Sequence, residues 1–285
     1  MKQSVAKKTL GSMIALCLFA GIGFMGTTTA TAQEQASGTT PPPKVLVIMR
    51  EFLKPGKGGM AHQKTESAFV QAFTNANSPD HYFAMDSLSG KTRSLFFMGF
   101  DSFGDWGKAN EAIMQNPTLA EAFDGAMQAD GELLRAYDEG AFVFQPDKSV
   151  SPAVDIAHMR YMEITTIKVR VGHDEDWDAL AKMHDDIYRN VPNAHWAMYK
   201  KAFGSESGSV YLALAAIRSL ADLDQRRADG KKAWDAVSAG DKKRAEDLEA
   251  STLESLETNL FAFNPKISYP QPSWVKADPS FWGQK

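Results

Sequence analysis

The chain contains AFVFQPDKS at positions 141–149 and LFAFNPKIS at positions 260–268. Each stretch joins an apolar, aromatic run typical of a β-strand to a proline that would end the strand. Further matches precede both stretches in the same order. Arg50 corresponds to Arg160, His81 corresponds to His195, and the apolar run at 94–97 corresponds to the run at 209–212. An ordered series of matches of this kind predicts one structural unit present in two copies.

Each copy is predicted to contain a strand, a helix, two strands, a helical region and a closing strand. In the first copy, helical spacing of apolar residues begins at Met60. Asn116-Pro117 interrupts the second helical region, whose buried face we extend to Tyr137. The expected strands are 44–52, 81–88, 93–100 and 141–145 in the first copy, and 156–170, 195–202, 209–217 and the run ending at 263 in the second. This order is that of a ferredoxin-like βαββαβ unit.

The predicted fold class is therefore α+β, with two tandem ferredoxin-like repeats. Such a sheet carries helices on one face only, so its other face needs a cover. We expect the two antiparallel sheets to pack face to face. With its two closing Phe-x-Phe-[Gln/Asn]-Pro motifs, the stretch 44–268 resembles the dimeric α/β-barrel superfamily. Families of that kind include antibiotic-biosynthesis-monooxygenase-like, NIPSNAP-like and EthD-like proteins. The resemblance implies a pseudo-dimeric barrel with a small-molecule cavity between the halves.

The ends of the chain differ in composition from the repeats. Lysines, an apolar run at 13–25 and the small residues Ala30-Thr31-Ala32 predict a secretory signal peptide at 1–32. A flexible, Pro-rich linker follows at 33–43. Repeat 1 is expected at 44–150, repeat 2 at 151–268, and an aromatic tail that packs over the body at 269–285. We therefore expect export to the periplasm or secretion, with no stable membrane span after the signal is removed.

Composition excludes several classes of function. Cys17 is the only cysteine and lies in the expected signal, so the mature protein should lack disulfides, thiolate nucleophiles and cysteine metal sites. The net charge of the whole chain is −4, and the signal contributes only basic residues, which argues against a nucleic-acid partner. The histidine spacings include no His-x-His or His-x₃-His, so we predict no metal site and no built-in cofactor.

Polar side chains on the predicted strands are the candidate ligand-binding residues, because a buried polar group must find a partner. They are Arg50, His81, His158, Arg160, His195 and Tyr199. If 156–170 is one strand, His158 and Arg160 share a face, and Arg160 could bind an anionic or carbonyl group while His158 transfers a proton. A structural alternative is that the two arginines form ion pairs, with Glu51 or Glu163 as partners, and that His81 and His195 are turn residues.

Three functions are compatible with these observations. The leading hypothesis is an exported protein that binds a small apolar molecule between the two halves without a cofactor. The second is a cofactor-independent monooxygenase or isomerase, which would require the polar candidates to converge in the cavity. The third is a structural or interaction module that uses the sheet faces and the aromatic tail. The sequence does not specify the ligand, the catalytic residues or the oligomeric state.

Overall fold

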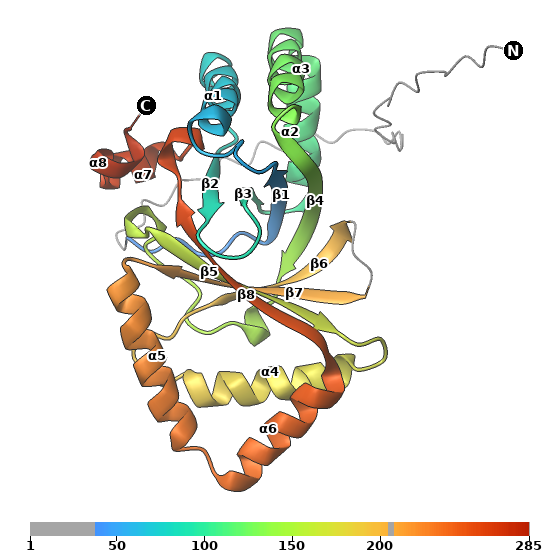
Figure 1. Ribbon diagram of the computed structural model, residues 1–285, viewed down its shortest axis with the longest axis vertical. Coiled ribbons are helices and arrows are strands. Elements are labelled where there is room, and N and C mark those ends of the chain that lie inside the picture. Colours follow the sequence, from blue (N-terminus) through green and yellow to red (C-terminus); the bar gives the residue numbers. More distant parts are fainter. Residues whose placement is uncertain (1–37, 205–207, 285) are drawn as a thin grey trace, which may run out of the picture. The chain divides into compact units, whose positions relative to one another are not determined.

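The structure is a computed structural model that describes residues 38–204 and 208–284. The predicted signal peptide lies outside these residues. In the first half (38–150), the order is strand, helix, two strands, two helices and strand (Figure 1). The elements are β1 (Val45–Leu53), α1 (Met60–Asn75), β2 (Tyr82–Ser87), β3 (Arg93–Phe100), α2 (Phe103–Gln115), α3 (Pro117–Gly131), β4 (Leu134–Phe144) and the short 3₁₀ turn η1 (Pro146–Lys148).

The second half (151–268) follows the same element order after a second 3₁₀ turn. Its elements are η2 (Ile156–His158), β5 (Tyr161–Val169), α4 (Asp174–Tyr188), β6 (Ala197–Gly204), β7 (Ser209–Ile217), α5 (Leu220–Asp235), α6 (Ala239–Thr252), β8 (Leu253–Phe263) and η3 (Pro265–Ile267). Two short helices complete the described chain, α7 (Pro272–Ala277) and α8 (Pro279–Trp282). No helix in the described parts of the chain is long and apolar enough to cross a membrane.

The eight strands form one closed antiparallel barrel in the order β1-β3-β2-β8-β5-β7-β6-β4. Each half supplies four neighbouring strands, and the halves join where β2 pairs with β8 and β4 pairs with β6. The two predicted sheets thus meet edge to edge as well as face to face. Closure leaves no free sheet edge, which removes the usual route to strand-mediated aggregation.

Alternation along each strand separates two apolar regions. In β1, Leu46 and Ile48 belong to the cluster that fills the barrel interior, whereas Val45 and Val47 pack beneath α2. The interior cluster also includes Phe97, Phe142, Phe261 and further buried residues from both halves. Helices cover the outer faces, with α1 to α3 over the first half and α4 to α6 over the second (Figure 1).

Local sequence signals explain several boundaries. α1 begins at Met60 as predicted, and the β2–β3 hairpin turns at Gly90, whose φ of 73° favours glycine. Asn116 caps α3 by accepting a hydrogen bond from the Leu119 backbone N–H, with Pro117 at the first helical position.

Two expectations about strands are wrong. β4 starts at Leu134, not 141, so Leu134 and Tyr137 belong to a strand instead of the buried face of a helix. The reason is that residues 134–140 are held in register along β1, which local helical spacing does not reveal. The predicted strand 156–170 instead begins with the turn η2, and His158 therefore does not share a strand face with Arg160.

Both described ends pack against the barrel. Trp282 is 2% exposed and belongs to the interior cluster, and its indole N–H donates to the Ala157 carbonyl at 2.8 Å. The expectation that the aromatic tail packs over the body is therefore confirmed. In the described part of the predicted linker, the Thr40 N–H donates to Val154, and the Tyr199 hydroxyl donates to the Pro43 carbonyl at 2.9 Å. Residues 40–43 thus contact the barrel and do not act as a free tether.

Candidate functional site

A cavity of about 410 Å³ opens at the end of the barrel where β1 starts and β3 ends. Its lining comes from both halves. Leu46 and Phe97 lie on the first-half side, and Met162 and Leu214 on the second-half side. Pro41 to Pro43 and the tail residue Trp274 also line this space, which we call the barrel-mouth cavity. Its lining is mainly apolar, so it can hold an apolar molecule.

Three of the six predicted site residues line the barrel-mouth cavity: His81, His195 and Tyr199. The His81 ring stacks on Tyr269 with 4.8 Å between centroids, and its Nδ1 is buried without a hydrogen-bond partner. His195 Nε2 lies 2.5 Å from the Ala216 carbonyl oxygen. Burial lowers the pKa of both histidines, against the effect of backbone hydrogen bonds, and it raises the pKa of Tyr199.

The other three predicted residues bind elsewhere. Arg50 forms a two-point ion pair with Asp138 of β4, with Nε to Oδ1 at 2.5 Å and Nη2 to Oδ2 at 2.8 Å. Arg160 pairs with Asp278 in the tail and lies over the Phe281 ring. His158 contacts Asp155 at 2.7 Å and is partly exposed. The ion-pair alternative thus describes both arginines, but with partners other than Glu51 and Glu163.

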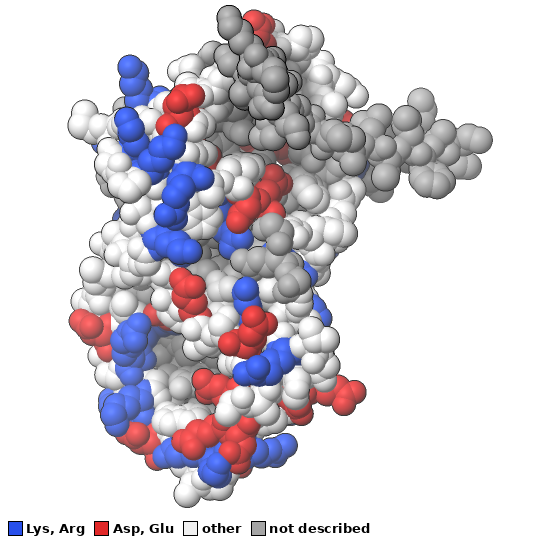
Figure 2. All heavy atoms as spheres, turned by 45° about the vertical axis from the view of Figure 1, so that its right-hand side comes forward, with Lys and Arg blue, Asp and Glu red and all other residues white. Residues whose placement is uncertain are grey.

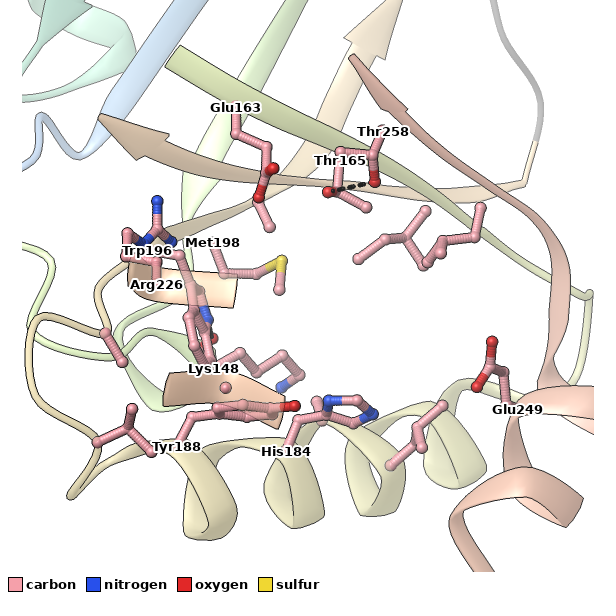
Figure 3. A pocket seen from close by; sticks show the side chains of 18 of the residues that line it. Lys148, Glu163, Thr165, His184, Tyr188, Trp196, Met198, Arg226, Glu249 and Thr258 are labelled. Atoms are coloured by element: carbon pink, nitrogen blue, oxygen red, sulfur yellow. Dashed lines mark hydrogen bonds between the residues drawn. The ribbon is translucent and has the colours of Figure 1, made fainter. Parts of the chain in front are cut away.

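A second cavity, of about 390 Å³, lies between the outer face of the second-half sheet and its helices. Figure 3 shows His184 and Tyr188 on α4 directed toward this helix-side cavity, with Glu249 on α6 at its edge. No side chain of α5 is buried. In Figure 2, charges of both signs alternate over the part of the molecule formed by α4 to α6. Among the first-half helices, the Phe123 ring instead packs against Phe69 and Phe73, with ring centroids 5.6 Å and 5.0 Å apart.

Burial lowers the pKa of His184, and the Glu249 charge opposes this only in part. The imidazole is therefore neutral near pH 7 and can accept a proton inside the cavity. Trp177 adds an indole N–H that is buried without a hydrogen-bond partner. The helix-side cavity thus combines an apolar lining with a neutral base and a free donor.

The lowered pKa of His184 predicts a loss of stability in acid. The unfolded chain binds a proton at this histidine near its ordinary pKa of 6.5, whereas the folded protein resists protonation until lower pH. Stability from this group is full above pH 6.5 and falls below it. We expect His184→Gln, which cannot be protonated, to lose less stability than the unmodified protein between pH 7.5 and 5.5, as measured by urea unfolding. His158→Gln, at a partly exposed site, is the control. An equal loss in all three proteins would contradict the assignment.

A group of buried ionisable residues lies behind the first-half sheet. It consists of Glu51 on β1, His62 and Glu66 on α1, and Asp130 on α3, each at most 4% exposed. His62 Nε2 is 2.9 Å from Glu51 Oε2, 3.6 Å from Asp130 Oδ1 and 3.8 Å from Glu66 Oε1. We call these four residues the buried carboxylate cluster.

The environment of this cluster shifts several pKa values. Burial raises the pKa of Glu66 to about 10, helped by the charges of Glu51, Asp130 and Asp86. Burial alone would lower the pKa of His62, but the hydrogen bond to Glu51 and the charges of Asp130 and Glu51 raise it overall. Sequence reasoning missed the cluster because it considered only spacings between histidines. The available signal was His62 and Glu66 at i and i+4 on one helix face.

Comparisons with known proteins place the fold but not the family. No protein-family model matches the chain, and no curated protein matches it. A provisionally named monooxygenase from Fusobacterium nucleatum has a similar structure, with a TM-score of 0.50 and 10% identity, covering 78% of this chain and 93% of that one. The fold is that of the dimeric α/β barrels. The predicted barrel fold is thus confirmed, and membership of a family is not shown.

Other solved structures resemble the chain more weakly. An anthrone oxidase-like protein has a TM-score of 0.47 at 13% identity over 78% of this chain and 92% of that chain. A provisionally named chlorite dismutase has a TM-score of 0.47 at 10% identity over 77% and 95%.

Proposed function

We propose that this protein binds a small, largely apolar molecule in the barrel-mouth cavity, between two ferredoxin-like halves that arose by duplication. The observation that supports this most is the cavity itself, whose mainly apolar lining comes from both halves. Arg50 and Arg160 are held in ion pairs away from it, so no cationic side chain among the predicted residues is available to bind an anion there. An uncharged ligand fits this lining best.

A matched pair of substitutions on β7 tests this proposal. Ala216 lines the barrel-mouth cavity and Ala213 lines the helix-side cavity, so the same change to Phe fills one cavity at a time. The probe is N-phenyl-1-naphthylamine, an uncharged apolar dye whose fluorescence rises when it leaves water. We expect Ala216→Phe to weaken its binding at least about tenfold, the effect of losing roughly 1.4 kcal/mol. Ala213→Phe should bind as the unmodified protein does. The reverse pattern, or no binding at all, would refute the proposal.

An enzyme remains the second candidate, and the neutral His184 in the helix-side cavity is the observation that favours it. The role would be proton abstraction from a bound phenol or similar acid, whose anion then reacts with oxygen without a cofactor. Oxygen uptake with a panel of polycyclic phenols tests this. We expect the unmodified protein to take up oxygen. His184→Gln should lose this activity, and His158→Gln should retain it. No uptake across the panel, or equal rates in both variants, would remove this candidate.

We also propose that the protein is exported, with cleavage after Ala32, on the basis of the lysines and the short apolar run before it. N-terminal sequencing of the protein recovered from its native host would show Gln33 as the first residue. A first residue other than Gln33 would contradict this cleavage site.

A further inference from the structure

Two carboxylate oxygens of the buried carboxylate cluster have no hydrogen-bond partner. Glu66 is 2% exposed and Asp130 is 1% exposed, yet Glu66 Oε1 and Asp130 Oδ2 have no hydrogen-bond partner. A buried carboxylate oxygen without a partner is strongly disfavoured, because it has lost its water and gained nothing in return. A single imidazole nitrogen faces all three carboxylates and is within hydrogen-bond distance of Glu51 only. Something other than these side chains would have to complete the site.

The four side chains present suitable donor atoms at suitable distances. One ligand atom from each, an imidazole nitrogen or a carboxylate oxygen, lies within 4.8 Å of the others. Ligand atoms around one ion at about 2.1 Å are about 3 to 4 Å apart, so small side-chain rotations would bring the set together. The donors come from β1, α1 and α3; α1 packs against α3, and the contact of His62 with Glu51 joins α1 to β1. Rigid placement of this kind favours a defined coordination geometry.

A second layer of contacts orients these donors. The Thr65 hydroxyl donates to Asp130 Oδ1 at 2.5 Å, which leaves Oδ2 free to bind an ion. Contacts that hold a ligating carboxylate in place are a regular part of metal sites in proteins.

We propose that Glu51, His62, Glu66 and Asp130 bind one divalent transition-metal ion of the Mn²⁺, Fe²⁺ or Zn²⁺ class. An imidazole with three carboxylates is a mixed nitrogen and oxygen donor set, which suits these ions better than the softer Cu⁺ or the all-oxygen preference of Ca²⁺ and Mg²⁺. The site lies behind the first-half sheet and contributes none of the residues that line the barrel-mouth cavity. It is therefore independent of the proposed ligand site.

Metal binding to the full-length mature protein tests this directly. Protein stripped with EDTA in denaturant is refolded with Mn²⁺ or Zn²⁺, dialysed, and assayed for bound metal by mass spectrometry, because a buried site fills most readily during folding. We expect about one ion per chain with either metal and none with Mg²⁺ at equal concentration. His62→Gln and Glu66→Gln should each reduce the affinity at least 30-fold. The matched control is His158→Gln, which alters the partly exposed pair of His158 and Asp155 and should retain one ion.

Three outcomes would overturn the proposal. These are less than a tenth of an ion per chain after refolding, loss of metal in His158→Gln, or full binding in both cluster variants. Circular dichroism and urea unfolding of each variant separate loss of the site from loss of the fold, since Gln preserves the size of Glu66. A folded Glu66→Gln protein without metal supports the assignment. Removal of a bound ion should also lower the melting temperature of the unmodified protein, because binding only to the folded state stabilises it.

Discussion

Trp282→Ala is expected to lower the free energy of unfolding by about 3 to 5 kcal/mol, the usual cost of removing a buried Trp side chain. Trp282 is almost fully buried although it lies near the end of the described chain. Its ring meets Phe263 and Phe281 edge to face, with centroids 5.9 Å and 5.0 Å apart, and contacts Trp274. The substitution would also leave the Ala157 carbonyl without its indole donor.

Urea unfolding measures this effect, and two further variants control it. Trp282→Phe keeps most of the ring and should cost less than Trp282→Ala. Phe203→Ala removes an aromatic ring that is 63% exposed and should change stability by no more than about 0.5 kcal/mol. A change below 1 kcal/mol for Trp282→Ala would mean that the tail is not part of the core. The third hypothesis, in which the tail serves assembly, would then gain support.

The ion-pair partners expected for the two arginines were wrong because the true partners are distant in sequence. Arg160 lies 118 residues from its partner Asp278, and Arg50 lies 88 residues from Asp138. Glu51 and Glu163 were the expected partners because each is close in sequence to one of these arginines. Closing a barrel brings together segments that are distant in sequence, and local pattern contains no information about such pairs.

Signals within a few residues of each other predicted the element boundaries more accurately. The start of α1 at Met60, the β2–β3 hairpin and the break between α2 and α3 at Asn116 follow from helical spacing, a glycine turn and a capping Asn. β4 was predicted too short because its first residues are largely exposed and lack the alternation of a half-buried strand. Pairing with β1, not local propensity, keeps that segment extended.

The candidate sites also differ in how far the sequence could indicate them. His81 and His195 could be proposed because they hold matching positions in the two halves, and Tyr199 because it lies on the same predicted strand as His195. All three line the barrel-mouth cavity. The buried carboxylate cluster could not be assembled from sequence, since its members come from three elements and Asp130 lies 68 positions beyond His62. Only the packing of α1 and α3 on β1 brings them within contact distance.

Glu66→Gln is expected to stabilise the metal-free protein at neutral pH. Burial raises the pKa of Glu66 to about 10, from an ordinary 4.5, so the folded protein holds a proton that the unfolded chain releases. Above pH 4.5 each further pH unit therefore costs about 1.4 kcal/mol of stability. At pH 7.5 this amounts to as much as about 4 kcal/mol. Gln resembles the protonated acid in shape and needs no proton, so the variant avoids this cost.

Urea unfolding in EDTA from pH 4.5 to 8 tests the sign and the slope. The advantage of Glu66→Gln should be near zero at pH 4.5 and grow as pH rises. Glu121→Gln, an exposed change on α3, should match the unmodified protein throughout. Equal or lower stability of Glu66→Gln at pH 7.5 would show that Glu66 is ionised and paired in the folded state. Saturating Mn²⁺ should reduce this advantage by about 2 kcal/mol or more, because a 30-fold tighter site stabilises the protein that retains Glu66 more than the variant. A carboxyl group that destabilises the metal-free fold and strengthens metal binding would have its role in binding and not in folding.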